Sequence, residues 1–251
     1  DPLKYYRNNT QNSRNLIAAC IDAGVQQLVF SSTAAVYGIP AEQPATEQTA
    51  TAPINAYGRS KLMTEWMLQD VADRPGAEPP FRFVALRYFN VAGARPDLRV
   101  GQATPEATHL IKVACQAALG QRDSVSIFGT DYPTPDGTGV RDYIHVEDLA
   151  SAHLAALDYL RGGGDSHIMN CGYGRGYSVR EVMQMVRQVS GVDFRIDEAP
   201  RRAGDPPELV AGTSLIHEVL DWTTRYEDLE FICRTALDWE RAWSERQKAT
   251  A

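Results

Sequence analysis

Short stretches rich in apolar residues alternate along this chain with longer stretches whose apolar residues recur at helical spacing. Strands are predicted at 28–31, 81–87, 125–128, 142–145, 166–170 and 194–196. Helices are predicted at 1–24, 57–71, 106–119, 147–160, from 179 onward and at 226–243. Such an alternation predicts an α/β fold with a mainly parallel sheet that helices cover on both faces.

Composition and charge exclude several classes of protein. Of the 251 residues, 43% are hydrophobic and 23% charged, as in ordinary globular proteins. The net charge of −7 and the lack of a Lys/Arg run argue against a nucleic-acid surface. No apolar run of about 18 residues predicts a membrane span, so we expect a cytoplasmic protein. Because Cys20, Cys115, Cys171 and Cys233 show neither pairing nor C-x-x-C spacing, we expect free thiols and no metal site.

Tyr57, Lys61 and Thr33 form the candidate catalytic group. Tyr57 and Lys61 are four residues apart in a helix that turns by about 100° per residue, so they share one face. An ammonium beside a phenol lowers a pKa that starts near ~10 and makes a general base usable at neutral pH. Thr33 follows the strand at 28–31, where its hydroxyl would face the crevice at the end of a parallel sheet. The ordinary alternatives are an exposed Tyr/Lys helix face and a turn-capping threonine.

Five further stretches narrow the interpretation. They are FSSTAAVYG at 30–38, LRYFN at 86–90, IFGTDYPT at 127–134, DGTGVRDYIHV at 136–146 and PRRAGD at 200–205. With the Ser-Ser-Thr and Tyr-x-x-x-Lys residues, they resemble the UDP-glucose 4-epimerase family of the extended short-chain dehydrogenase/reductase superfamily. The resemblance implies a Rossmann-like doubly wound sheet and NAD as cofactor. It also implies a homodimer that interconverts UDP-glucose and UDP-galactose in galactose metabolism.

The Gly-rich turn that holds the cofactor pyrophosphate in this family is not found in the chain. No G-x-G-x-x-G follows an apolar strand, and the nearest approach is GYGRG at 172–176. We therefore expect a fragment that lacks about 90 residues, at about 30 residues per βαβ unit, and that binds little NAD alone. The remainder of the NAD-binding domain would be 1–90 and 136–170. A smaller UDP-sugar lobe would comprise 91–135 and 171–251.

The resemblance also assigns roles to individual residues. It places Asn8, Ser31 and Tyr88 at the cofactor, together with Tyr57 and Lys61. The residues that it places at the UDP-sugar are Thr33, Asn90, His109, Leu110, Phe128, Arg141, Arg202, Asp205 and Leu209. The arginines suit a diphosphate because a guanidinium pairs bidentately with phosphate oxygens. Leu209 matches the position where a tyrosine in some members closes the pocket around the sugar's 2-substituent.

Each of these residues also has a structural interpretation. The arginines could form surface ion pairs with Asp142 or Asp205. Phe128 and Leu209 could belong to the core, Asn8 could lie on a polar helix surface, and His109 could be an unremarkable residue near a helix start. We expect His145 to be structural.

Three rival functions remain. Dehydratases of the superfamily carry Asp-Glu directly after the threonine, where this chain has Ala34 and Ala35. A non-catalytic, NAD-sensing protein would share the scaffold, although the intact Thr33, Tyr57 and Lys61 argue against a decayed site. The third rival is an inactive truncated epimerase.

Overall fold

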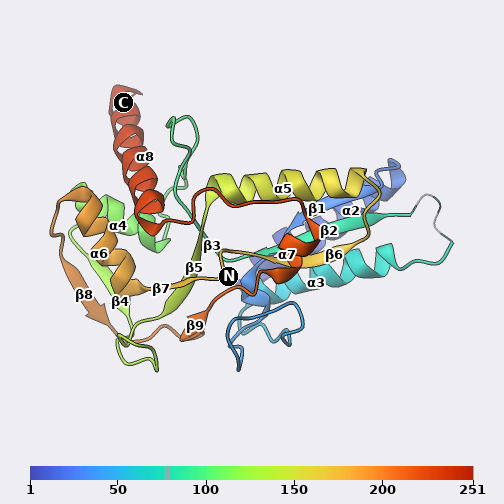
Figure 1. The fold of residues 1–251 in the computed structure, drawn as a ribbon, viewed down its shortest axis with the longest axis horizontal. Coiled ribbons are helices and arrows are strands. Elements are labelled where there is room, and N and C mark those ends of the chain that lie inside the picture. Colours follow the sequence, from blue (N-terminus) through green and yellow to red (C-terminus); the bar gives the residue numbers. More distant parts are fainter. Residues whose placement is uncertain (77, 79, 251) are drawn as a thin grey trace. The chain divides into compact units, whose positions relative to one another are not determined.

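The computed structural model describes residues 1–76, 78 and 80–250, which its contacts divide into two compact units (Figure 1). The first unit comprises Asp1–Phe89, Ala150–Gly174 and Leu209–Thr223. The second unit comprises Asn90–Leu149, Arg175–Glu208 and Thr224–Ala251. Neither unit is continuous in the sequence.

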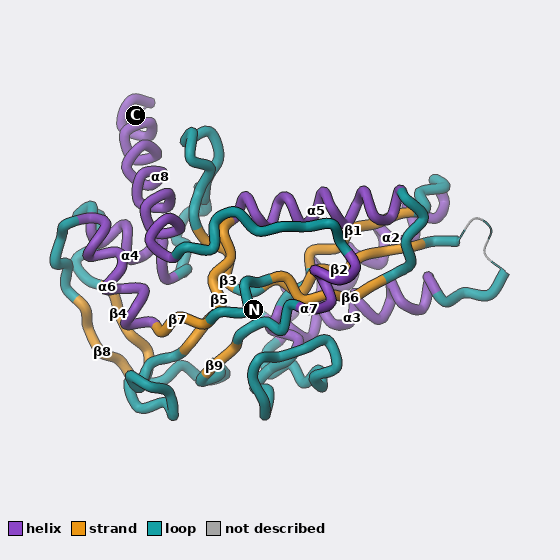
Figure 2. Tube along the Cα trace, viewed as in Figure 1, coloured by secondary structure: helices purple, strands orange, loops and turns teal. Residues whose placement is uncertain are grey.

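The first unit contains a parallel sheet of the predicted kind (Figure 2). Its strands are β1 (Gln27–Ser31), β2 (Arg82–Tyr88) and β6 (His167–Cys171), in the order β1-β2-β6. β1 is parallel to β2, and β2 is parallel to β6. Because the strands run the same way, their carboxyl ends lie at one edge of the sheet, where ligands of such folds bind.

Helices accompany this sheet. They are α1 (Pro2–Tyr5), the π-helix η1 (Tyr6–Gln11), α2 (Asn12–Asp22), the 3-10 helix η2 (Ala34–Val36), α3 (Ala56–Ala72) and α7 (Ser214–Val219). The helix α5 (Val146–Arg161) begins in the second unit and continues in the first. Within the first unit, α5 is tied to both ends of β1, because Gln27 Nε2 donates to Leu160 O at 3.0 Å and Ser31 Oγ lies 2.9 Å from His153 Nε2.

The start of α3 is fixed by its cap. The Asn55 side chain accepts a hydrogen bond from Gly58 N at 2.8 Å, which satisfies one of the free N–H groups of the first turn. The cap places Tyr57 in that first turn.

One face of the parallel sheet is covered by α2 and α3. Phe83 and Ala85, two residues apart in β2, pack with Ile17 of α2 and Leu68 of α3 in a buried cluster. Period-two alternation puts these β2 side chains on the same face. Burial of this cluster holds α3, and with it the candidate catalytic residues, against the sheet.

Two further sheets are built on strands of the second unit. β5 (Val140–His145) lies between the parallel β3 (Asn90–Ala92) and the antiparallel β7 (Gly176–Ser178). β4 (Val125–Phe128) pairs in parallel with β8 (Ile196–Ala199). The two-residue strand β9 (Glu208–Leu209) lies where the chain passes back to the first unit.

Three helices of the second unit pack on one another. They are α4 (Leu110–Ala118), α6 (Val179–Ser190) and α8 (Leu229–Thr250). A buried ion pair joins Lys112 of α4 to Glu240 of α8 at 2.6 Å. Ser178 and Glu181 form a capping box at the start of α6, which fixes where this helix begins.

The alternation of strands and helices confirms the predicted α/β class, with differences of detail. α4 begins at Leu110 instead of 106, because the preceding His109 has an extended backbone. Strands β3, β7 and β9 and helix α7 have two to six residues each, too few for a periodic pattern to show. Residues 136–149 lie in the second unit, where β5 pairs with β3 and β7, and residues 209–223 lie in the first.

Candidate active site

The Thr33 hydroxyl and the Tyr57 phenol interact in the first unit, and this interaction lowers the pKa of Tyr57. Thr33 precedes η2 and also accepts a hydrogen bond from Ala35 N at 3.1 Å, so it caps that helix as well. The turn-capping interpretation of Thr33 is confirmed, and its role at a substrate stays a prediction. The pair lies just beyond the carboxyl end of β1, where a substrate hydroxyl could approach both oxygens.

Gly58 explains how α3 comes so close to this loop. A Cβ atom on Gly58 would lie 2.5 Å from Ala35 O and 2.9 Å from Pro53 Cβ. Contacts under 3.0 Å are essentially never made by real Cβ atoms, so only glycine allows this approach. The Y-G-R-S-K sequence thus brings the Tyr57 turn against the loop that carries Thr33.

Lys61 lies on the same side of α3, as the spacing predicted. Its Nζ donates to Ser31 O at 2.8 Å and lies 4.9 Å from the centre of the Phe30 ring. Burial lowers the pKa of the Lys61 ammonium. Lys61 therefore contacts the end of β1 one helical turn beyond the Thr33–Tyr57 pair.

The expected lowering of the Tyr57 pKa by Lys61 is wrong. Burial raises the pKa of Tyr57, while the Thr33 hydrogen bond lowers it and the nearby Tyr88 and Tyr5 raise it. The physical reason is that the Lys61 ammonium is directed to the Ser31 carbonyl and desolvation of the phenol prevails.

A second group of polar side chains surrounds Ser31. Its hydroxyl lies 2.9 Å from His153 Nε2. The same hydroxyl interacts with the Tyr88 phenol and lowers its pKa, although burial raises that pKa more, and the Tyr88 ring is 6.4 Å from the His153 ring. These groups, with Lys61 and Tyr57, offer hydroxyl and ammonium partners that fit the ribose and carboxamide of a nicotinamide riboside. Asn8 is exposed on η1, and its neighbour Asn9 instead donates to Ser60 Oγ at 3.0 Å.

The second unit contains a cleft of about 370 Å³. Seven residues expected at the UDP-sugar line it, namely Asn90, His109, Leu110, Phe128, Arg141, Arg202 and Asp205. These residues come from β3, α4 and its N-cap, β4, β5 and the loop after β8. Sequence segments more than a hundred residues apart are thereby brought to one cleft.

The two arginines that were expected in the cleft, Arg141 and Arg202, differ in their surroundings. Arg141 is half-buried, and its Nη1 donates to Val140 O at 2.8 Å. Burial lowers the pKa of Arg141, and the negative charge of Asp205 opposes this. Arg202 is exposed, with its guanidinium 3.8 Å from the centre of the Phe128 ring, a cation–π contact.

Several lining residues were not expected from the sequence. They are Thr108, Val113, Arg122, Ser124, Val125, Ser126, Tyr132, Gly139, Tyr143 and Val179. Ser126 could have been found, because it is two residues from Phe128 in β4 and shares its face. Tyr143 is paired with Asn90 across β5 and β3, a register that the sequence does not reveal.

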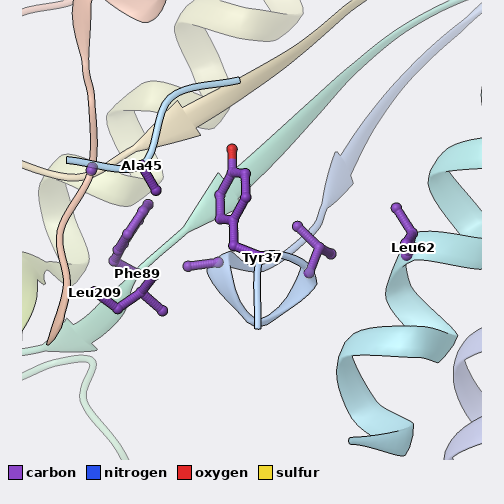
Figure 3. Packing of buried hydrophobic residues seen from close by; sticks show 8 residues of the cluster. Tyr37, Ala45, Leu62, Phe89 and Leu209 are labelled. Atoms are coloured by element: carbon purple, nitrogen blue, oxygen red, sulfur yellow. The ribbon is translucent and has the colours of Figure 1, made fainter. Parts of the chain in front are cut away.

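Leu209 is not among the residues that line this cleft. It is 8% exposed and belongs to a buried cluster of the first unit with Tyr37, Phe89 and Ala45, which Figure 3 shows from close by. Leu209 therefore has a core role in the first unit, and its contact with a sugar stays a prediction.

A parallel sheet with Thr33, Tyr57 and Lys61 at its carboxyl edge defines a short-chain dehydrogenase/reductase type of protein. Comparison with known proteins identifies one family within this class. Residues 1–172 match the model of the NAD dependent epimerase/dehydratase family. The chain belongs to this family.

Relatives are similar over nearly the whole chain. A UDP-glucose 4-epimerase of Azospirillum brasilense is 60% identical over 241 residues, which are 96% of this chain and 68% of that protein. The structure of the UDP-Glc/GlcNAc 4-epimerase of Campylobacter jejuni is 53% identical with a TM-score of 0.80, covering 96% of this chain and 72% of that one. The UDP-glucose 4-epimerase of Brucella ovis in complex with NAD is 46% identical with a TM-score of 0.89, covering 95% and 72%.

Within residues 1–76, 78 and 80–250, no helix combines the length and the apolar character needed to cross a membrane.

Proposed function

We propose that this protein is an NAD-dependent isomerase that interconverts UDP-glucose and UDP-galactose through a 4-keto sugar. The observation that carries the proposal is the interacting Thr33–Tyr57 pair, with Lys61 one turn further along α3 and bonded to Ser31 O at 2.8 Å. The names of the relatives support the same activity.

The chemistry explains why these residue types are needed. The C4–H bond of a hexose is not acidic, so C4 is inverted by oxidation followed by reduction from the other face. Bound NAD supplies a hydride acceptor and donor for this purpose. In its phenolate form, Tyr57 takes the proton from the sugar O4 hydroxyl and later returns it, a general base and acid role. Thr33 holds O4 by a hydrogen bond and shares the proton with Tyr57.

The residues around Ser31 would hold the nicotinamide riboside. Lys61 would bind the ribose hydroxyls, while Ser31 and Tyr88 would supply hydroxyl partners to the carboxamide. Their hydrogen bonds in the first unit keep these groups in place before any ligand binds. Asn8 is proposed as a further cofactor contact.

In the second unit, we assign the nucleotide part of the substrate to the cleft of about 370 Å³. Arg141, Arg202 and Asn90 would bind the diphosphate, and His109, Leu110 and Phe128 would contact the nucleoside. Inversion requires the 4-keto hexose to present both faces in turn, so UDP must be held firmly while the hexose stays loose. Binding energy from the remote nucleotide then retains the reactive end during catalysis.

We further propose a cytoplasmic homodimer that serves galactose metabolism and uses neither nucleic acid nor membrane as a partner. The acidic composition, with a net charge of −7, supports the proposal that neither nucleic acid nor membrane is a partner.

A second substrate is supported by one relative. The Campylobacter jejuni protein, 53% identical, bears the name UDP-Glc/GlcNAc 4-epimerase. We propose that this protein prefers UDP-glucose and UDP-galactose and also accepts UDP-N-acetylglucosamine. Dehydration is disfavoured, because Ala34 and Ala35 supply no acid beside Thr33 to expel the C6 hydroxyl.

The test is to incubate the whole protein with UDP-galactose and NAD and to identify the product by proton NMR. We expect UDP-glucose, at the equilibrium ratio reached from either sugar. A 4-keto-6-deoxy sugar as the product would replace the proposal with a dehydratase, and unchanged UDP-galactose would refute it.

A further inference from the structure

Three consecutive residues at the end of β1 each interact with α3. Ser31 O accepts from Lys61 Nζ, the Ser32 hydroxyl donates to the Glu65 carboxylate, and the Thr33 hydroxyl interacts with the Tyr57 phenol. Their partners on α3 are spaced four residues apart, so three successive turns of one helix face these three consecutive residues, although not in the same order. The proposed reaction uses the Tyr57 and Lys61 contacts and assigns no part to Glu65.

We propose that Glu65, with Ser32 and Arg87, is a positioning group that sets the register of the β1–η2 loop on α3 and thereby places Thr33 against Tyr57. This inference rests on the proposed function, because the pair that it positions is the one that exchanges the O4 proton.

Arg87 of β2 holds the Glu65 carboxylate from the other side. Its Nε donates to Oε1 at 3.0 Å and its Nη2 donates to Oε2 at 2.6 Å, a bidentate arrangement. The two side chains are only 6% and 1% exposed. Burial would lower the pKa of Arg87, but the hydrogen bonds and charge of Glu65 raise it overall, so the guanidinium stays charged.

The network continues into the segment that follows Thr33. Arg87 Nη1 donates to the Tyr37 hydroxyl at 3.1 Å, and that hydroxyl donates to Asn170 Oδ1 of β6 at 2.6 Å. Asn170 Nδ2 donates to Ala45 O at 2.8 Å. Tyr37 and Asn170 are both completely or almost completely buried. The loop from Ser32 to Tyr37 is thus fixed at its two ends, one by Glu65 and one by Arg87.

Stability alone does not account for these buried charges. A buried ion pair loses so much hydration that replacement by apolar residues of similar volume is often neutral or stabilising. Apolar packing is non-directional, whereas hydrogen bonds to a fixed carboxylate define one register. The close contact at Gly58 leaves the loop no room to move toward α3, so the bonds of Ser32 and Tyr37 decide where it lies along the helix.

The test compares Ser32→Ala and Glu65→Gln with wild type in the whole protein. Ser32→Ala removes one hydroxyl and leaves the Arg87–Glu65 pair intact, so the fold is retained even if Glu65→Gln is unstable. We expect Ser32→Ala to lower kcat by ~10-fold to ~10²-fold, the scale of a misplaced catalytic group, with the Kd for UDP unchanged. The ionisation of Tyr57, followed by tyrosinate absorbance relative to Tyr57→Phe, should move to higher pH as its hydrogen bond to Thr33 weakens.

Ser166→Ala is the matched control. The Ser166 hydroxyl accepts from Phe83 N at 3.1 Å near the opposite end of β2, so this change also deletes one hydroxyl bonded in the first unit. We expect it to leave kcat and the Tyr57 ionisation unchanged. Wild-type kcat and an unchanged ionisation pH in Ser32→Ala, or equal effects of both serine changes, would overturn the positioning role. If wild type has no epimerase activity, the proposed function fails, and the Tyr57 ionisation still decides the positioning role.

Discussion

Arg141→Met is expected to weaken binding of UDP without weakening binding of uridine. Methionine keeps an unbranched stem of similar reach but removes the charge and the hydrogen-bond donors. Arg141 lines the cleft of the second unit, and its bond to Val140 O holds the guanidinium in one place before a ligand arrives. The change therefore deletes a preorganised partner of the diphosphate and leaves the nucleoside contacts in place.

The magnitude follows from the kind of bond that is lost. A net hydrogen bond to a charged group contributes about 1.5–3 kcal/mol. Because Arg141 is half-buried, solvent screening reduces this contribution less than it would at an open surface. At about 1.4 kcal/mol per tenfold, the Kd for UDP should rise ~10-fold to ~150-fold.

Isothermal titration calorimetry with UDP and with uridine measures both constants. Arg180→Met is the charge-matched control, since Arg180 pairs with Glu198 on the exposed surface of the same unit. We expect this control to bind UDP like wild type. A Kd for UDP within about twofold of wild type in Arg141→Met, or an equal loss for uridine, would refute the assignment of the diphosphate to this arginine.

Three other changes test separate parts of the structure. Gly58→Ala forces a Cβ atom to within 2.5 Å of Ala35 O. The free energy of unfolding, measured by urea denaturation, should fall by ~1–3 kcal/mol, and kcat should fall as well; unchanged stability and kcat would contradict the close contact. Lys112→Met leaves Glu240 charged and buried, which should lower the free energy of unfolding by ~3–5 kcal/mol. The double change Lys112→Met/Glu240→Leu should recover part of this loss, and additive losses would contradict the pairing. Leu209→Tyr should raise the activation free energy for UDP-N-acetylglucosamine relative to that for UDP-glucose by ~1–3 kcal/mol. An unchanged ratio of the two turnover rates would leave Leu209 with its core role alone.

The sequence predicted those features that depend on local spacing. Tyr57 and Lys61 share a side of α3 because helix geometry requires it, and Thr33 follows β1 because the apolar run ends there. Seven residues of the cleft in the second unit were predicted through resemblance, since no spacing rule links Asn90 to Arg202. Their gathering at one cleft became visible only in the fold.

Other features depend on the tertiary environment and could not be predicted from the sequence. The direction of the Tyr57 pKa shift reflects burial and the orientation of Lys61 toward Ser31, neither of which spacing reveals. Glu65 lies one helical turn beyond Lys61, and its spacing does not distinguish it from an exposed helix residue. In the structure it is buried against Arg87 of β2. Leu209 directly follows a polar stretch and still packs in the core cluster of the first unit.

The central claim is that Tyr57 carries the O4 proton during C4 epimerisation, and turnover of UDP-galactose by Tyr57→Phe tests it most directly. Phenylalanine keeps the ring and removes only the hydroxyl that interacts with Thr33. We predict that kcat falls at least ~10²-fold, the scale of general acid–base catalysis, while the Kd for UDP stays that of wild type. Near-normal turnover of UDP-galactose by the folded Tyr57→Phe protein would contradict the account.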